Sequence, residues 1–231
     1  MNLIQNVSEP NHLMLVWQSP DLDGGPRVRK RYVVADVFRD GDDAYLVYRD
    51  DEGTKNAETL GFRGYPAFNL SRTRHQNVIG AFMRRMPPRD RSDYHKYLER
   101  FRISNVEMSD FALLGYTEAK LPTDGFSLVN PLNDVSVPSE YLLELSGYRK
   151  YISDAYEMAL GDQLELESEP TNEHDASAVK FVWNGKVVGY VNRVQAPAVS
   201  RWLTSQKLGC VFERRNGTAD RPRGYAFLTV L

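Results

Sequence analysis

Hydrophobic and polar positions change their spacing along the chain, and each spacing predicts a different kind of element. In the first fifth of the chain, β-branched and aromatic residues gather in three short runs that predict strands. These runs are LMLVW (13–17), RYVVADVF (31–38) and AYLVY (44–48). Because only Arg39-Asp40-Gly41-Asp42-Asp43 separates the last two runs, we expect them to form a hairpin.

The following segment has helical spacing instead. NVIGAFMRRM (77–86) leads to Pro87-Pro88 and then to RSDYHKYLERF (91–101), in which aromatic and leucine side chains recur every three or four residues. A proline pair separates two helices, and Ser92 or Asp93 is a suitable N-cap for the second. Strands followed by helices predict an α+β domain.

Strand patterns return in the C-terminal half. The strongest turn signal is Trp183-Asn184-Gly185-Lys186, because Asn-Gly supplies the positive φ angles of a tight hairpin. One helix is expected over 195–206, with Ala198, Trp202 and Leu203 on one face. The pattern predicts a small, mainly β barrel with one inserted helix. Its strand runs are YLLELSGY (141–148), QLELESEP (163–170), AVKFVWNGKVVGYV (178–191) and GYAFLTVL (224–231).

A boundary between two domains is expected at NPLNDVSVPS (130–139), where prolines, asparagines and small polar residues interrupt the apolar periodicity. The predicted division is a first domain over 1–131, a linker over 132–139 and a second domain over 140–231.

Charge is balanced overall, with 29 Lys and Arg against 31 Asp and Glu, but it is distributed unevenly. Residues 134–175 hold 2 basic and 11 acidic side chains, whereas residues 176–231 hold 9 basic and 2 acidic ones. A third segment, 72–102, holds 9 basic against 3 acidic residues. Its arginines form an auxiliary basic patch, or else they pair with the acidic hairpin of their own domain. They include Arg84, Arg85, Arg89 and Arg91.

Catalytic and metal-binding patterns are missing from the sequence. It has no phosphate-binding glycine loop, no nucleophile elbow and no zinc-protease motif. The four histidines lie far apart, and Glu173-His174-Asp175 is expected to be a polar turn, since neighbours on an extended segment point to opposite sides. We therefore expect no enzyme activity, no cofactor and no metal.

The cellular setting follows from cysteine usage and hydropathy. The single cysteine, Cys210, lies in the apolar run LGCVF and is expected to be buried rather than nucleophilic. No apolar stretch is long enough to cross a membrane, and no signal-peptide pattern occurs. We expect a cytoplasmic protein that does not associate with membranes.

Ordered motifs in the C-terminal half resemble the HIRAN domain family over residues 140–231. The resemblance implies a small OB-like β-barrel that binds single-stranded DNA at its 3′ end and does not catalyse. The motifs are Leu145-Ser146-Gly147-Tyr148-Arg149-Lys150-Tyr151, Glu169-Pro170-Thr171-Asn172-Glu173-His174-Asp175, Ala178-Val179-Lys180, Gly185, and Val188-Gly189-Tyr190-Val191.

The same resemblance implies roles for seven residues in binding nucleic acid. Arg149 and Arg193 would contact phosphates, Tyr151 would line the base or sugar, and Tyr190 would lie beside the backbone. Asp175 would accept a hydrogen bond from the 3′ hydroxyl, or else it is part of a self-bonded turn with Asn172. Lys150 and His174 replace aromatic rings of the family member with known end recognition, which implies less stacking and more salt-sensitive phosphate binding.

Glutamates at 165, 167 and 169 are expected to point outward on alternate positions of one strand, away from the phosphate path. The basic segment 176–231 would form that path.

Residues 13–129 resemble the N-terminal subdomain of HipA-type toxin kinases, without the kinase body. The resemblance depends on the VW strand, the hairpin and LVYRDDEG, on Phe82-Met83-Arg84-Arg85-Met86-Pro87, and on Asp110-Phe111-Ala112-Leu113-Leu114. It implies a domain that docks on a protein. The leading hypothesis is a bacterial or phage DNA-binding protein that tethers a HIRAN-like barrel to this docking domain. The alternative is an antitoxin or regulatory subunit that restrains a HipA-like kinase.

Overall fold

The computed structural model describes residues 1–20, 30–104, 106–121, 124–155 and 157–231. They divide into two compact units that are both discontinuous in sequence. The N-terminal unit comprises Glu9–Tyr94 and Met108–Asp134, and the C-terminal unit comprises Met1–Ser8, His95–Glu107 and Val135–Leu231. This differs from the contiguous division expected above, because 1–8 and 95–107 belong to the unit that contains the second predicted domain.

An antiparallel sheet of five strands, in the order β4-β3-β2-β1-β5, forms the centre of the N-terminal unit. The predicted hairpin is confirmed, since β2 and β3 are paired from Asp40 and Asp43 next to the turn as far as Ala35 and Tyr48. The two edge strands were not predicted, because each has only three or four residues. The bounds are β1 His12–Gln18, β2 Arg31–Asp40, β3 Asp43–Tyr48, β4 Arg74–Gln76 and β5 Phe126–Val129.

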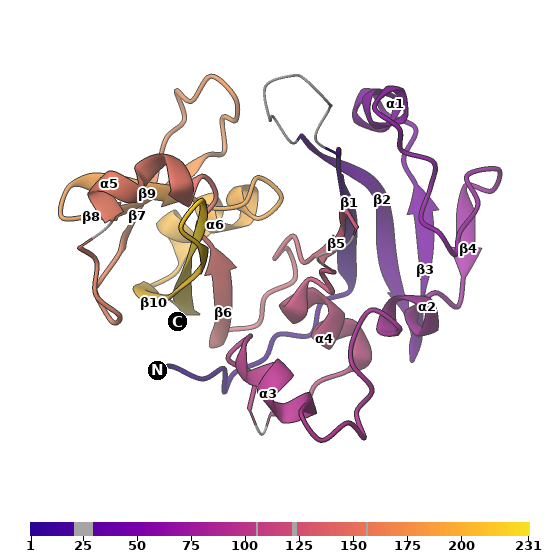
Figure 1. The fold of residues 1–231 in the computed structure, drawn as a ribbon, viewed down its shortest axis with the longest axis horizontal. Coiled ribbons are helices and arrows are strands. Elements are labelled where there is room, and N and C mark those ends of the chain that lie inside the picture. The colour runs from indigo at the N-terminus through magenta and orange to yellow at the C-terminus, as the bar shows by residue number, and fades with distance from the viewer. Residues whose placement is uncertain (21–29, 105, 122–123, 156) are drawn as a thin grey trace. The chain divides into compact units, whose positions relative to one another are not determined.

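Three helices pack on this sheet: α1 contacts β2, α2 contacts β3 and α4 contacts β5 (Figure 1). The helix α2 confirms the expected helical segment around 77–86, although it is shorter. The helix α1 was not predicted, because only Thr54 and Ala57 are buried on it. The bounds are α1 Glu52–Thr59, α2 Ile79–Met83 and α4 Asp110–Thr117.

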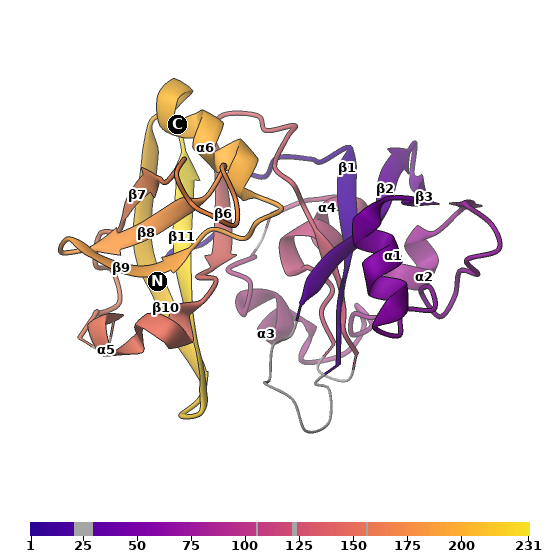
Figure 2. The same cartoon turned by 90° about the horizontal axis from the view of Figure 1, so that it is seen from above.

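The C-terminal unit contains two three-stranded antiparallel sheets, β10-β11-β6 and β7-β8-β9 (Figure 2). Single bridges join them at both edges, Ser146 with Tyr190 and Gln163 with Val211. The predicted barrel is therefore confirmed in part, as two sheets joined at their edges. The bounds are β6 Ser139–Glu144, β7 Glu165–Ser168, β8 Val179–Trp183, β9 Lys186–Tyr190, β10 Leu208–Thr218 and β11 Arg221–Val230.

Helical elements of this unit lie between the strands of its two sheets and in the inserted segment 95–107. The predicted helix over 195–206 is α6, which buries Ala198 and Trp202 and leaves Leu203 half-buried. The predicted tight turn is present, with φ of 49° at Asn184 and 74° at Gly185. The bounds are α3 Tyr94–Glu99, a 3-10 turn η1 Tyr148–Tyr151, α5 Ile152–Ala155 and α6 Ala196–Ser205.

The expected basic patch at 84–91 is not a continuous surface. Arg85 is buried, with 6% of its side chain exposed, and it forms a bidentate ion pair with Asp124, with two hydrogen bonds of 2.8 Å. Arg89 pairs with Asp110 and Arg91 pairs with Asp93. Arg84 is exposed. The pairing partners are thus not those of the acidic hairpin, and Arg85 belongs to the core because it also donates to two backbone carbonyl oxygens.

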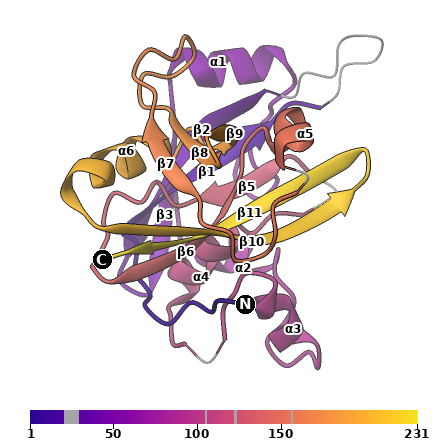
Figure 3. The same ribbon diagram turned by 90° about the vertical axis from the view of Figure 1, so that its left-hand side faces the viewer.

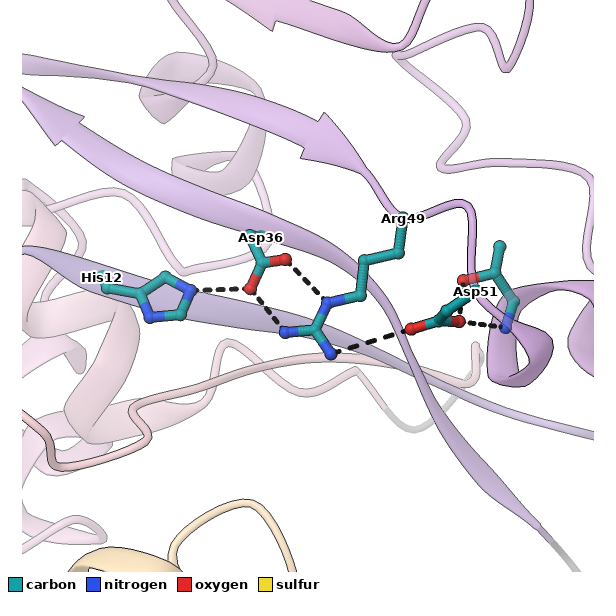
Figure 4. A network of polar contacts seen from close by, with 5 residues as sticks. His12, Asp36, Arg49 and Asp51 are labelled. Atoms are coloured by element: carbon teal, nitrogen blue, oxygen red, sulfur yellow. Dashed lines mark hydrogen bonds and ion pairs between the residues drawn. The ribbon is translucent and has the colours of Figure 1, made fainter.

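A polar network crosses the sheet of the N-terminal unit (Figure 4). The guanidinium of Arg49 donates to both carboxylate oxygens of Asp36, at 2.6 and 2.7 Å, and His12 Nε2 lies 2.7 Å from Asp36 Oδ1. Because an ionised carboxylate only accepts, Nε2 of His12 carries the hydrogen. Burial alone would raise the pKa of Asp36, but the hydrogen bonds from His12 and Arg49 and the charge of Arg49 lower it from 3.8 to about 2.

Candidate functional site

The turn η1 is placed against β9 by a close crossing of the backbone in the C-terminal unit. Ser146 and Tyr190 exchange two backbone hydrogen bonds, of 2.7 and 2.9 Å. At Gly189 a Cβ would lie 2.9 Å from the Cβ of Leu145, so this crossing requires glycine. Gly147 then begins the turn in the left-handed region, with φ of 76°. As a result, η1 packs against β9 and brings its side chains to the end of that strand.

Two tyrosines meet at this crossing. The rings of Tyr151 and Tyr190 are tilted by 47°, with centroids 6.1 Å apart, and both side chains are half-buried. The hydroxyl of Tyr190 donates to Glu169 Oε2 at 3.1 Å. Burial, together with the neighbouring Tyr151 and Glu169, raises the pKa of Tyr190, so its hydroxyl remains a hydrogen-bond donor at neutral pH.

The loop between β7 and β8 is organised by Asn172. Its side-chain oxygen accepts hydrogen bonds from the backbone amides of His174 and Asp175, at 3.0 and 3.2 Å, while its amide donates to Glu169 at 2.5 Å. Asp175 Oδ1 in turn accepts from the amide of Ser177 at 2.9 Å. The expected polar turn, self-bonded through Asn172 and Asp175, is therefore confirmed.

Asp175 keeps a second carboxylate oxygen on the side of Arg193. The distance from Asp175 Oδ2 to Arg193 Nε is 3.9 Å, and 22% of the Asp175 side chain is exposed. Arg193 is 77% exposed and also donates to the backbone oxygen of His174. An arginine, a half-buried carboxylate and the end of an ordered loop are thus held together.

The structure gathers five of the seven expected site residues into one linked group. Tyr151 and Tyr190 join the loop through Glu169, and the loop joins Arg193. The remaining two, Arg149 and Lys150, are exposed on the same turn as Tyr151. The seven residues are Arg149, Lys150, Tyr151, His174, Asp175, Tyr190 and Arg193.

One expectation about the glutamates is wrong. Glu165 and Glu167 are exposed on β7, and Glu167 pairs with Lys180 at 3.1 Å, but Glu169 lies beyond the end of that strand. There it accepts from Tyr190 and Asn172 instead of pointing outward, and these hydrogen bonds, that of Asn172 first, lower its pKa. The outward alternation of the strand does not extend past residue 168, and the following Pro170 was the signal that it would stop.

Two further residues shape the site and were not predicted. Tyr148 is fully buried at the start of η1, stacked near Phe212 with centroids 6.2 Å apart. Arg215 on β10 donates to the Tyr148 hydroxyl at 2.8 Å and to the carbonyl oxygen of Met158 at 3.2 Å. No local pattern in the sequence links residues that are 67 positions apart, so only the fold reveals this support.

The described residues offer neither a metal-binding cluster nor an exposed thiol. Among them, no three His, Cys, Asp or Glu side chains lie close enough together to hold a metal ion. Cys210 is buried, as expected, and burial raises the pKa of its thiol to about 12. No helix among the described residues is both long and apolar enough to cross a membrane.

The C-terminal unit contains a small β domain, in which two sheets are joined at their edges. A site with cationic and aromatic side chains lies at one of these joins. Residues 144–223 match the family model described as the HIRAN domain, and this span includes all seven expected site residues. The chain therefore contains a HIRAN domain within its C-terminal unit. The matched span lies outside 13–129, so the resemblance of that segment to HipA-type kinases stays a prediction.

Two solved structures are similar to part of this chain. The HIRAN domain of human HLTF is 19% identical, with a TM-score of 0.33, over 39% of this chain and 74% of that chain. A protein from Lactobacillus plantarum is 15% identical, with a TM-score of 0.34, over 41% of this chain and 96% of that chain. No curated protein matches the sequence.

Proposed function

We propose that this chain is a DNA-binding protein whose HIRAN domain holds a single strand or a 3′ end at the site around η1 and β9. The observation that supports this most directly is that three kinds of side chain occur in the linked group and on the turn beside it. Arg149, Lys150 and Arg193 supply exposed cations, Tyr151 and Tyr190 supply rings, and Asp175 supplies a carboxylate.

Each kind of side chain complements a chemical group at the end of a DNA strand. Guanidinium and ammonium groups attract phosphates, and their contribution decreases as salt increases. A half-buried tyrosine ring offers a surface on which a base or sugar packs, and stacking on an aromatic ring contributes about 1–3 kcal/mol per base. A terminal hydroxyl differs from an internal phosphate in that it donates a hydrogen bond, which the second oxygen of Asp175 can accept.

The order of the loop supports binding without large rearrangement. Asn172 and Ser177 already fix the backbone around Asp175, so little conformational entropy would be lost when a strand end binds there. The carboxylate of Glu169 accepts hydrogen bonds from Tyr190 and Asn172, so it faces the loop.

Fluorescence anisotropy of labelled DNA tests this proposal. The probes are a single strand with a free 3′ hydroxyl, the same strand with a 3′ phosphate, and a duplex, each measured across salt concentrations. We expect the free 3′ end to bind more tightly than the 3′ phosphate, because Asp175 repels a terminal phosphate and accepts from a hydroxyl. Equal binding of both strands would contradict end recognition.

Asp175→Asn is the informative variant. Asparagine keeps an oxygen for the amide of Ser177 but replaces the second carboxylate oxygen by a donor, so the turn is retained while acceptance of the hydroxyl is lost. The matched control is Asp162→Asn, which alters a carboxylate that bonds the amide of Ala159. Loss of end preference in the control as well would show that the effect is not local to the site.

We further propose that the protein binds DNA without cleaving it. The candidate site offers a carboxylate that is already bonded to the backbone. Incubation of the labelled strand with the protein and Mg²⁺ or Mn²⁺ tests this. Cleavage that depends on the divalent ion and disappears in Asp175→Ala would contradict the proposal.

A further inference from the structure

The strands β10 and β11 extend well past the third strand of their sheet. β6 pairs with β11 only from Tyr225 to Val230, whereas β10 and β11 continue to pair as far as Thr218 and Arg221. The end of this two-stranded ribbon projects beyond the other strands of the C-terminal unit (Figure 2 and Figure 3). We call residues 214–224 the ribbon.

The ribbon is strongly basic. It contains four arginines and one acid, Asp220. Residues directly opposite each other in an antiparallel pair share a face, and so do residues two apart on one strand. Because Arg214 pairs with Tyr225, Asn216 with Arg223 and Thr218 with Arg221, three arginines lie on one face.

Two arginines of that face make contacts within the C-terminal unit. The guanidinium of Arg214 lies 4.4 Å from the centre of the Tyr225 ring and donates to the carbonyl oxygen of Arg100. Burial first, and then the nearby charge of Arg102, lower the pKa of Arg214. Further along, Arg221 is exposed, and Arg223 is 53% exposed with its Nε 3.9 Å from Glu144.

The opposite face fastens the ribbon to the candidate site. Arg215 bonds the hydroxyl of Tyr148, the first residue of η1. At Gly224, a Cβ would lie 2.8 Å from the Tyr148 ring, so that ring packs directly against the ribbon. An isolated two-stranded ribbon is marginally stable in water, and these contacts hold this one in a fixed position next to η1.

We propose that the ribbon is a second DNA contact, in which Arg221 and Arg223 bind phosphates of duplex DNA while the site around η1 takes a strand end. A two-stranded ribbon fits the major groove of B-form DNA, and arginine binds phosphate oxygens with two parallel hydrogen bonds. The proposal rests on the proposed function and extends it to junctions between a duplex and a single strand.

Anisotropy with the full chain tests the ribbon separately from the end site. One probe is a blunt 20-base-pair duplex whose 3′ ends carry phosphates, and the other is a six-nucleotide single strand with a free 3′ hydroxyl. The variant is Arg221→Gln with Arg223→Gln, both at exposed positions. Its matched control is Lys30→Gln with Lys55→Gln, which removes two exposed charges outside the basic segments.

We expect the ribbon variant to reduce the salt slope for the duplex by about 2 in log–log form, since each lost phosphate contact contributes about 0.9. Between 50 and 200 mM salt, wild-type affinity for the duplex would then fall roughly tenfold further than that of the variant. Binding of the short strand should change less than about twofold.

Three outcomes overturn the ribbon contact. A duplex slope equal to that of the lysine control shows that the arginines bind no phosphates. An equal loss on the short strand assigns them to the strand path instead of the duplex. If wild type binds neither probe, both proposals fail. If wild type shows no preference for the free 3′ end while the ribbon variant loses duplex binding, the ribbon contact holds and only end recognition fails.

Discussion

Replacing Arg85 by alanine should destabilise the N-terminal unit without a specific effect on DNA binding. The guanidinium donates to both oxygens of Asp124 at 2.8 Å, to the carbonyl oxygen of Ala119 at 2.7 Å and to that of Phe126 at 3.0 Å. Its removal leaves the carboxylate without its cation and two carbonyl oxygens without a donor.

Breaking a buried ion pair by removing one partner costs about 3–5 kcal/mol, because the remaining charge is left uncompensated. For a unit of this size, such a loss lowers the melting temperature by roughly 10–20 °C. Arg89→Ala is the matched control, since the Arg89 side chain is 59% exposed and its partner Asp110 is 42% exposed. An exposed pair contributes about 0–1 kcal/mol, so this control should melt within a few degrees of wild type.

The assay is urea unfolding combined with hydrogen exchange read out on peptides from 9–94, which reports on the N-terminal unit itself. DNA affinity is measured in parallel below the unfolding transition. Arg85→Ala with unchanged stability but weaker DNA binding would refute the reasoning, because it would return Arg85 to an accessible basic patch. The double variant Arg85→Ala with Asp124→Ala should be more stable than Arg85→Ala alone, since the unpaired carboxylate is gone.

Two further perturbations probe the polar contacts of each unit. The pKa of Asp36 is lowered to about 2, so this carboxylate contributes about 2 kcal/mol of stability at pH values above about 4, and this contribution is lost as the pH falls from there through 2. Asp36→Asn should therefore be less stable than wild type at pH 6, and its stability should depend less on pH during acid unfolding. Parallel acid unfolding profiles of the two proteins would contradict the network in Figure 4. The side chain of Glu213 is 3% exposed and lies 2.8 Å from Arg102 Nε and 2.7 Å from the side-chain amide of Asn2. Glu213→Ala should lower the free energy of unfolding by about 3–5 kcal/mol and accelerate hydrogen exchange in 1–8 and 95–107. Unchanged exchange in these segments would show that other contacts hold them.

Elements with a strong local pattern were predictable from the sequence. The tight turn at Asn184-Gly185 and the helix α6 are both present where residue type predicts them. β10 was missed because its second half, ERRNGT, is continuously polar and carries no alternation. α1 has a suitable N-cap in Asp51, which accepts from the amide of Thr54 at 2.7 Å, but with only Thr54 and Ala57 buried it carries no apolar stripe that would predict a helix.

The candidate site was predictable in its parts but not in its connections. The family resemblance indicated seven residues, and the structure links five of them through Glu169. From the alternation of the strand, Glu169 was expected to point away from the site. The support that Arg215 gives to Tyr148 depends on strand pairing across the whole unit, which no local spacing reveals. The arginines at 84–91 illustrate the same limit, because a run of like charge does not show which of its members is buried.

The discontinuous C-terminal unit also constrains the order in which the protein can fold during synthesis. Asn2 bonds Glu213, which lies 211 positions later, and Ile4 forms a bridge with Ile103. Residues 1–8 must therefore wait until β10 has been made, whereas the N-terminal unit has all of its residues by Asp134. Because non-local contacts close slowly, residues 1–8 are exposed to proteases and chaperones until β10 has been made, and a nascent chain stalled before β10 should be cut in this segment.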